Sequence, residues 1–455
     1  MSEHPDNVHT LTIERMGYGA DGISHLPDGK VAFVHGAIPG DVVRATVVED
    51  KRRYARCEAV DVIEPSIDRV TPPDGLLRSI APWADMSYGL QLSAKERNVR
   101  DALSRTGRFD DATVDRAMRP IRPSERESGY RNKVELSVAR DGRGRIELGF
   151  KDGRDRFVPF EGKSLGIVDP IIQEAPRKLA GALRYVLRDD DSGLFRVGLR
   201  GSSATGSVEL ALWTRPGPFP RAFASHVLED AISATSVVRV IADEGAARRV
   251  RRVEVLSGKG FWSERMDVGG GMLLKVSAPS FFQVNTQVAS AVVREALDAI
   301  SSRTGGLSGK RIADLYCGAG TFTIPLASEG ADVLAVEVAG SSMRDLERNA
   351  SALGVEPTIV CDDVEHALRG MGGEEACFDA VMVDPPRSGI SQDALEGIMA
   401  LRSPVLVYMS CDPQTFARDA GRLASAGWTL ESVVPYDMFP QTWHVETLAV
   451  FHSDI

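Results

Sequence analysis

From residue 310 to residue 452, short apolar runs alternate with longer stretches in which apolar residues recur at helical spacing. Such runs indicate buried strands, and the stretches between them indicate amphipathic helices. The predicted strands are 310–316, 332–337, 357–361, 378–384, 404–410, 430–436 and 445–452, and the predicted helices are 321–328, 341–352, 391–401 and 413–426. This alternation predicts an α/β domain with a doubly wound, mostly parallel sheet, in which ligands bind beyond the carboxyl ends of the strands.

The chain before this domain shows two further patterns. Residues 1–66 contain short apolar runs separated by glycine-containing gaps, which predicts a small closed β-barrel. These runs are 11–15, 30–34, 42–49 and 54–63. Residues 67–280 mix helix and strand patterns, and the predicted helix at 85–107 can pack on the α/β domain that follows. We therefore predict a barrel at 1–66, an α+β domain at 67–280 and the α/β domain at 281–455.

A glycine turn ends the first strand of the α/β domain, where Asp314 is followed by Gly318 and Gly320. Glycines in such a turn let a ligand approach the backbone, although ordinary turns share the pattern. Glu337 ends the second strand, where a carboxylate can accept hydrogen bonds from ribose hydroxyls. Position 323 is a threonine, not the third glycine that a dinucleotide pyrophosphate favours. The turn therefore predicts a mononucleoside cofactor such as S-adenosylmethionine.

Polar residues also follow the later strands. Asp363 follows the third strand, Asp384 and Arg387 end the fourth, and Cys411 follows the fifth. Because parallel strands end at one edge of a sheet, these residues predict a single crevice. Cys411 precedes a predicted helix, whose N-terminus favours the reactive thiolate. The other four cysteines are expected to be buried packing residues, and they are Cys57, Cys317, Cys361 and Cys377.

A thiolate beside S-adenosylmethionine suits methylation of a pyrimidine ring. Carbon 5 of the ring is a poor nucleophile until a thiolate adds to carbon 6, and a base must later remove the proton from carbon 5. The candidate base is Glu446, which opens the last predicted strand and can face the crevice. An isolated glutamate is more often a surface residue.

The composition limits the partners and the location. The chain has 455 residues and a formal net charge of −10, and no apolar run approaches the ~20 residues of a membrane span. No signal-peptide pattern opens the sequence, so a cytoplasmic location without membrane attachment is expected. The five cysteines lack Cys-x-x-Cys spacing, which argues against a disulfide framework or a zinc site.

An acidic protein that binds RNA must do so through a local basic surface. The predicted surface is a hairpin in which basic residues stand beside Tyr54. Its basic residues are Lys51, Arg52, Arg53 and Arg56. Such a mixture can bind a nucleic-acid backbone and stack a base, and the alternative is a solvated hairpin tip.

The motifs together resemble one enzyme family. They are FFQVN at 281–285, DLYCGAGTFTIPLA at 314–327, DPPRSG at 384–389, SCDPQTFARD at 410–419 and HVETLAVF at 444–451. They resemble the uracil-5 RNA methyltransferases that act on tRNA and 23S rRNA, and the first 66 residues are similar to the TRAM domain of RNA-modifying enzymes. The resemblance implies a Rossmann-like catalytic domain, an OB-like barrel and RNA as the partner.

The resemblance also implies roles for individual residues. Cys411 would be the nucleophile and Glu446 the proton acceptor. S-adenosylmethionine or the target base would contact Gln283, Tyr316, Gly318, Gly320, Thr321, Glu337, Asp363 and Asp384. RNA would also contact Arg387 and the hairpin residues Lys51, Arg52 and Arg53. Thr321 stands where many members carry asparagine.

Many members of this family hold an iron–sulfur cluster, and here the corresponding stretch, 77–88, contains no cysteine. A cluster needs about four thiolates at one site. We therefore predict an iron-free protein, in which Ile80, Trp83 and Met86 stabilise this region by packing. No obligate protein partner is evident, so a monomer is expected.

Three alternatives remain open. Cytosine-5 RNA methyltransferases place a cysteine directly after the prolines of the fourth-strand motif, where this chain has Arg387. Amino-group methyltransferases place an aromatic residue there. An RNA-binding protein with an inactive methyltransferase fold would need neither Cys411 nor Glu446.

Overall fold

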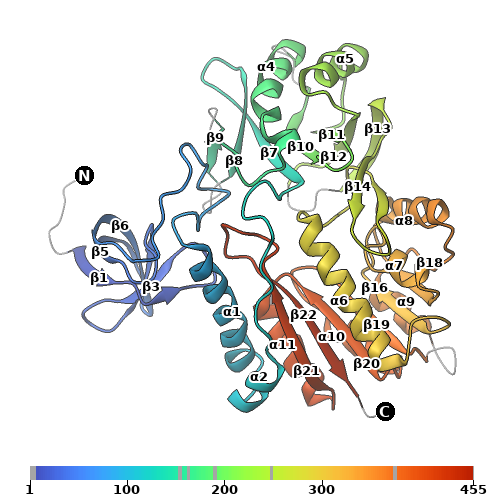
Figure 1. Ribbon diagram of the computed structural model, residues 1–455. Coiled ribbons are helices and arrows are strands. Elements are labelled where there is room, and N and C mark those ends of the chain that lie inside the picture. The colour runs from blue at the N-terminus through green and yellow to red at the C-terminus, as the bar shows by residue number, and fades with distance from the viewer. Residues whose placement is uncertain are drawn as a thin grey trace.

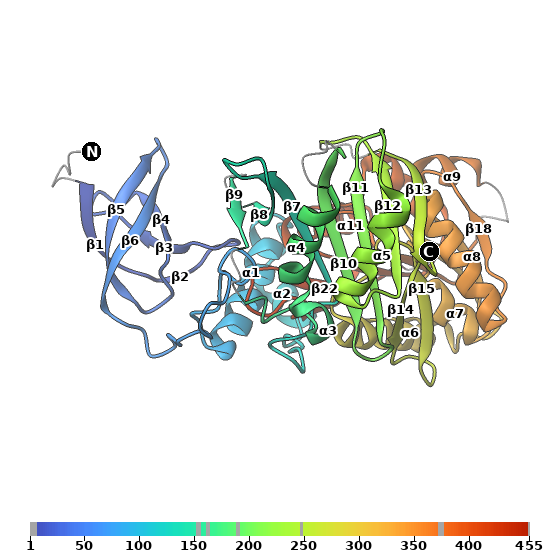
Figure 2. The same ribbon diagram turned by 90° about the horizontal axis from the view of Figure 1, so that it is seen from above.

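The computed structural model describes residues 7–151, 156–160, 164–187, 192–245, 249–371 and 377–453. It contains three large sheets that follow one another along the chain, and the first lies at one end of the molecule (Figures 1 and 2). No helix in these ranges is both long enough and apolar enough to cross a membrane.

The first sheet is a curled sheet of six strands in the order β1-β5-β6-β4-β3-β2. Its strands are β1 (Val8–Thr12), β2 (Arg15–Met16), β3 (Gly22–His25), β4 (Val31–His35), β5 (Val42–Asp50) and β6 (Tyr54–Glu64). Strands β1 and β2 are the two edges of this sheet, so hydrogen bonds between strands do not close the predicted barrel completely. Strand β2 has only two residues that can pair. Strand β3 was not predicted, since glycine opens it.

The central sheet has seven strands in the order β13-β12-β11-β10-β7-β8-β9. Its strands are β7 (Lys133–Arg140), β8 (Ile146–Lys151), β9 (Phe157–Pro159), β10 (Leu194–Ser202), β11 (Ser207–Thr214), β12 (Ser236–Ala242) and β13 (Val250–Gly258). Its helices are α3 (Pro170–Gln173), α4 (Ala175–Leu187) and α5 (Arg221–Ile232). Leu179, Leu183 and Leu228 of these helices share one hydrophobic core with the strands, as the predicted α+β domain requires.

The third sheet has the order β18-β17-β16-β19-β20-β22-β21, and all of its pairs are parallel except those of β22. Its strands are β16 (Arg311–Leu315), β17 (Asp332–Val336), β18 (Thr358–Val360), β19 (Ala380–Val383), β20 (Val405–Ser410), β21 (Thr429–Tyr436) and β22 (Glu446–His452). This is the predicted doubly wound sheet, and it carries an antiparallel strand between β20 and β21.

Helices cover both faces of this sheet. The core on one face includes residues of α6 (Thr286–Thr304), α7 (Thr323–Ser328) and α8 (Gly340–Leu353). The core on the other includes residues of α1 (Tyr88–Arg105), α2 (Asp111–Ala117), α9 (Val364–Gly370), α10 (Gln392–Ala400) and α11 (Pro413–Ser425). The molecule therefore places α1, from the chain before the central sheet, against the catalytic domain (Figure 1).

Several elements of this region were not predicted. Besides α2 and α9, the sequence analysis missed α6 and the hairpin of β14 (Trp262–Met266) and β15 (Met272–Val276). The hairpin shares its core with α6 and with the third sheet. The core of the third sheet therefore includes side chains that precede residue 281. Helix α1 begins at Tyr88, later than predicted, because the side chain of Ser87 caps it by accepting a hydrogen bond from the Leu90 amide.

Candidate active site

The glycine turn lies directly after β16, and its two glycines have different roles. Tyr316, Gly318 and Gly320 all have positive φ angles, of 62°, 55° and 93°. A Cβ added to Gly318 would meet nothing within 4 Å, so the chain is open there to a ligand. A Cβ added to Gly320 would lie 2.5 Å from Leu346 Cδ1 and 2.8 Å from Ile324 Cγ1. Gly320 is therefore required for packing, whereas Gly318 leaves space above the turn.

The carboxylate of Glu337 is fixed across this turn. Its Oε2 accepts a hydrogen bond from the Gly318 amide at 3.1 Å, and its Oε1 accepts one from the Ala339 amide at 2.7 Å. Each oxygen retains a lone pair for a further donor. Glu337 follows β17, so the structure places it where a ribose-binding carboxylate was predicted.

Two more carboxylates lie near Glu337. Asp314 is fully buried, and its Oδ2 accepts from the Thr323 hydroxyl while its Oδ1 has no partner. Asp384 accepts from Gln283 Nε2 at 3.4 Å. Burial raises the pKa of Asp314 to about 7, and burial with the nearby Asp314 charge raises the pKa of Asp384 to about 7. This acidic crevice fits S-adenosylmethionine, whose sulfonium is positively charged.

The remaining predicted cofactor residues surround the turn. Asp363 is exposed and caps α9, where its Oδ1 accepts from the Glu365 amide at 2.9 Å. Burial and the nearby Asp363 charge raise the pKa of Tyr316, so the two residues lie close together. Thr321 is half-buried and precedes α7, which begins two residues later than predicted.

The strand register brings Cys411 and Glu446 together. Ser410 at the end of β20 pairs with Thr447 in β22, and the two strands are antiparallel. The next positions in the register are therefore Cys411 and Glu446. Cys411 is half-buried, and Glu446 is only 3% exposed, so this glutamate is not a surface residue.

The expectation that Cys411 is a thiolate is wrong for the free protein. Burial, with the nearby Glu446 and Asp384 carboxylates, raises the pKa of the Cys411 thiol to about 12, although Arg387 opposes the shift. The N-terminus of α11 does not compensate, because Asp412 Oδ1 already accepts from the amides of Gln414 and Thr415 at 2.9 and 3.0 Å. Burial and the Asp384 charge also raise the pKa of Glu446 well above its usual range.

A cavity of about 410 Å³, which we call the strand-end cavity, adjoins this pair through Arg387 and Gln283. Phe281 lines it with a side chain that is 62% exposed, so an aromatic face is available to a planar ligand. Arg131 and Lys133 of the central domain line it as well. Nothing local in the sequence marks these two residues as part of the site, because only the fold brings them to this cavity.

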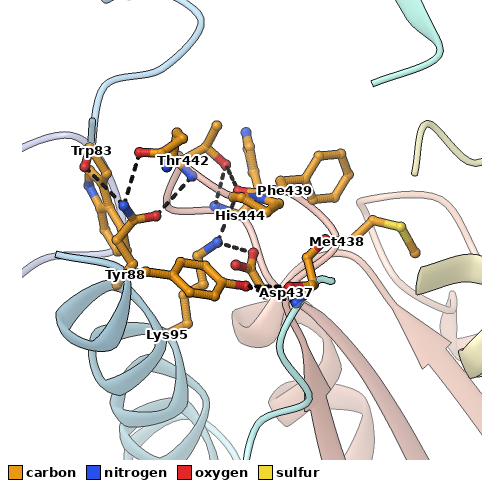
Figure 3. A network of polar contacts seen from close by, with 12 residues as sticks. Trp83, Tyr88, Lys95, Asp437, Met438, Phe439, Thr442 and His444 are labelled. Atoms are coloured by element: carbon orange, nitrogen blue, oxygen red, sulfur yellow. Dashed lines mark hydrogen bonds and ion pairs between the residues drawn. The ribbon is translucent and has the colours of Figure 1, made fainter. Parts of the chain in front are cut away.

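A buried network fixes the loop that leads into Glu446 (Figure 3). Lys95 of α1 forms an ion pair with Asp437, and its Nζ also donates to the Phe439 carbonyl at 3.0 Å. Gln91 Nε2 donates to Gln441 Oε1 at 3.0 Å, and Gln91 Oε1 accepts from the Gln441 amide at 2.8 Å. Lys95 and Asp437 are both fully buried. Helix α1 therefore positions the loop that carries the candidate base.

The predicted basic hairpin lies apart from this cavity. Lys51, Arg52 and Arg53 connect β5 to β6, are exposed, and do not line the strand-end cavity. Lys51 pairs with Glu49 at 2.8 Å. Their contact with RNA stays a prediction.

Two of the cysteine expectations need correction. Cys57 and Cys317 are buried as expected, but Cys361 and Cys377 are exposed, because each lies in the connection beside a strand.

The region predicted to replace an iron–sulfur site is packed. Trp83 and Met86 are buried in one cluster with Met16, while Ile80 contacts the central core instead. Within the part of the chain that the structure describes, no three His, Cys, Asp or Glu side chains are grouped to hold a metal ion. The absence of iron stays a prediction.

Comparison with known proteins identifies the relatives of this chain. Residues 231–453 match the family described as tRNA (uracil-5-)-methyltransferase, and residues 7–60 match the TRAM domain. An uncharacterized RNA methyltransferase of Thermosynechococcus vestitus is 32% identical over 453 residues, which cover 97% of each chain. Another from Gloeobacter violaceus is 31% identical over 459 residues, covering 97% of this chain and 95% of that one.

A solved structure shares the fold along nearly the whole chain. It is the Pyrococcus abyssi tRNA (uracil-54, C5)-methyltransferase in complex with S-adenosyl-L-homocysteine. The match has a TM-score of 0.74 at 23% identity, and it covers 97% of this chain and 99% of the other. The three-sheet architecture is therefore shared with an RNA-modifying enzyme. From the relatives and the matched domains together, the chain belongs to the tRNA (uracil-5-)-methyltransferase family of RNA methyltransferases, with a TRAM domain at its N-terminus.

Proposed function

We propose that this protein transfers a methyl group from S-adenosylmethionine to carbon 5 of a uridine in tRNA or rRNA. The observation that carries the proposal is the register of β20 and β22, in which Ser410 pairs with Thr447, so that Cys411 and Glu446 are the next positions at the strand ends. In this proposal Gly318, Glu337 and Asp363 bind the cofactor, together with Gln283, Tyr316, Gly320, Thr321 and Asp384. When bound, S-adenosylmethionine supplies an activated methyl group and a positive charge.

The first step is ionisation of Cys411. The thiol holds its proton in the free protein, since its pKa is about 12. Arg387 favours the thiolate, and a cation bound in the acidic crevice favours it further. Asp384, with a pKa of about 7, can accept the proton near neutral pH. Because the thiol ionises only when the site is loaded, it is protected from side reactions in the free protein.

The thiolate then adds to carbon 6 of the uracil ring. The new carbon–sulfur bond displaces the electrons of the 5,6 double bond toward oxygen 4. Carbon 5 would then form a bond to the methyl carbon as the methyl–sulfur bond breaks, and S-adenosylhomocysteine would leave. The Arg387 cation lies close enough to Cys411 and Glu446 to affect their pKa values, so it can stabilise the negative charge that develops on the ring.

Glu446 completes the reaction as the general base. Its carboxylate removes the proton from carbon 5, the 5,6 double bond forms again, and Cys411 leaves as a thiolate. Burial raises the pKa of Glu446, so its ionised form is a stronger base than an exposed glutamate. The same burial keeps water from competing for the adduct.

The test uses the purified protein with S-adenosylmethionine and unmodified tRNA and rRNA transcripts. Mass spectrometry of the digested RNA should find 5-methyluridine, and the same nucleoside should be missing from RNA of cells without the gene. 5-Methylcytidine would instead support the cytosine-5 alternative. RNA binding without any methylated nucleoside would support the inactive RNA-binding alternative.

A further inference from the structure

A second and larger cavity, of about 940 Å³, lies where the N-terminal sheet meets residues 78–86. We call it the barrel groove. Its lining includes Tyr18, Phe33 and Tyr54 from the N-terminal sheet, Trp83 from the connecting segment and Trp443 from the loop that precedes Glu446. The groove is therefore built by three parts of the chain that are distant in sequence, and each part contributes at least one aromatic residue to its wall.

The barrel groove adjoins the strand-end cavity. Ser79, Pro82 and Trp443 line both of them. The half-buried Trp443 ring lies 4.9 Å from the ring of His444, whose other side meets Phe439 at 5.6 Å. Trp443 therefore stands as a ridge between the two cavities, and a ligand that crosses the ridge would occupy both.

The inner end of the groove lies against the catalytic core. Tyr18 packs against the catalytic core, and the neighbouring turn is held by hydrogen bonds from Trp83 Nε1 to the Gly19 carbonyl at 3.0 Å and from Asn98 Nδ2 to the Gly17 carbonyl at 3.5 Å. Burial raises the pKa of the Tyr18 phenol, and the nearby Asp412 and Cys411 charges raise it further. The phenol is therefore neutral and lies near Cys411.

The chemistry of the wall favours bases over phosphates. Phe33 and Tyr54 form an edge-to-face pair at 5.7 Å, and the Arg56 guanidinium lies 6.0 Å from the centre of the Tyr54 ring. Arg56 is already paired with Asp21 at 3.6 Å and with Glu49 at 3.3 Å. A phosphate there would meet both carboxylates, whereas a base could stack on the rings.

We infer that the barrel groove seats the base of a nucleotide adjacent to the target uridine in single-stranded RNA, with the Trp443 ring between that base and the target. This inference rests on the proposed function. A uridine that leaves its stack to reach Cys411 exposes the face of its neighbour, and an aromatic ridge at this position can cover it. The aromatic wall makes the groove a stacking site rather than a phosphate site.

The test uses the RNA transcript that the wild-type protein methylates, prepared with one abasic ribose at each flanking position in turn. Loss of the seated base should lower kcat/KM about 5- to 150-fold at one neighbouring position, which is the usual range for a stacked base. In Trp443→Ala the same abasic substitution should change kcat/KM by less than about twofold, because the contact is already lost. Trp443→Phe should restore most of the penalty.

Tyr185→Ala is the matched control, since it removes an exposed aromatic residue on α4 of the central domain and should keep the wild-type abasic profile. S-adenosylmethionine binding, measured for every variant, shows that the catalytic domain is folded. A flat abasic profile in the wild type, or an equal penalty in Trp443→Ala, would overturn the inference while leaving the proposed function intact. A wild-type protein that methylates no transcript would overturn both.

Discussion

Two of the places where this molecule buries charged side chains have different surroundings. At the joint between α1 and the third sheet, Lys95 and Asp437 are fully buried and paired with each other. In the crevice, Asp314 is fully buried and Glu446 nearly so, and no ion pair to either is formed among the described residues. Burial lowers the pKa of Lys95 against the pull of Asp437, whereas it raises the pKa values of Asp314 and Glu446.

The comparison separates architecture from chemistry. A buried pair keeps both charges and fixes two elements, while buried carboxylates without a cation hold protons and can change charge when a ligand arrives. The joint should therefore respond to mutation through stability, and the crevice through activity and ligand binding.

The largest effect is expected at the nucleophile. Cys411→Ala should lower methyl transfer by more than about 10⁴-fold, because no other group can form the adduct at carbon 6. Binding of S-adenosylmethionine and the unfolding midpoint should stay close to wild type. Cys361→Ala, at an exposed cysteine, is the control and should remain active. Turnover of Cys411→Ala within tenfold of wild type would exclude the covalent mechanism.

Glu446→Gln should separate the two halves of the reaction. Turnover should fall about 10²- to 10⁴-fold, the usual contribution of a general base. Addition and methyl transfer should continue, so methylated RNA should accumulate as an adduct on the protein. Denaturing gels with labelled RNA would show this band, and the double variant Cys411→Ala/Glu446→Gln should lack it. Normal turnover of Glu446→Gln would mean that another base removes the proton from carbon 5.

At the joint, Lys95→Met should cost about 3–5 kcal/mol of unfolding free energy, since it leaves the Asp437 carboxylate buried without a cation. Denaturant titration measures this change. Replacing both partners, in Lys95→Met/Asp437→Leu, should restore much of the loss. A single variant as stable as wild type would mean that the pair does not fix the joint.

The smallest effect is a pH dependence of cofactor binding. The pKa values of Asp314 and Asp384 are raised from 3.8 to about 7, so both are largely protonated below that pH and gain charge above it. Cation binding should therefore tighten as the pH rises through about 7. Between about pH 6 and about pH 8, calorimetry should show S-adenosylmethionine binding improve roughly 3- to 10-fold.

S-adenosylhomocysteine is the control ligand for this titration, since it lacks the sulfonium charge, and its affinity should change less. In Asp384→Asn the pH dependence of S-adenosylmethionine binding should become weaker. Equal pH profiles for the two ligands would show that the crevice does not distinguish the sulfonium.

The third sheet and most of its strand ends were predictable because each signal is local. The glycine turn, Asp384 and Cys411 each follow an apolar run, and such runs identify strands reliably. Helix α6 was missed although its apolar residues recur at helical spacing, because its cap, Asn285, is also the last residue of the FFQVN motif.

Long-range contacts and burial explain the remaining differences. Nothing local marks Lys95 as buried, since its partner Asp437 is 342 residues away. The thiolate expectation for Cys411 failed for a related reason. A helix N-terminus was visible in the sequence, but the two carboxylates that surround the thiol, Glu446 and Asp384, come from other strands.

The position of β22 also constrains the order of folding. Among the described strands of the third sheet, β21 pairs with β22 alone, and β22 lies between β21 and β20 although it follows both in sequence. One edge of β20 must therefore stay unpaired until β22 adds to the sheet. The parallel strands that carry the glycine turn and Glu337 can assemble earlier. A folding intermediate that lacks only this last insertion would carry the glycine turn and Cys411 but not Glu446, the proposed base.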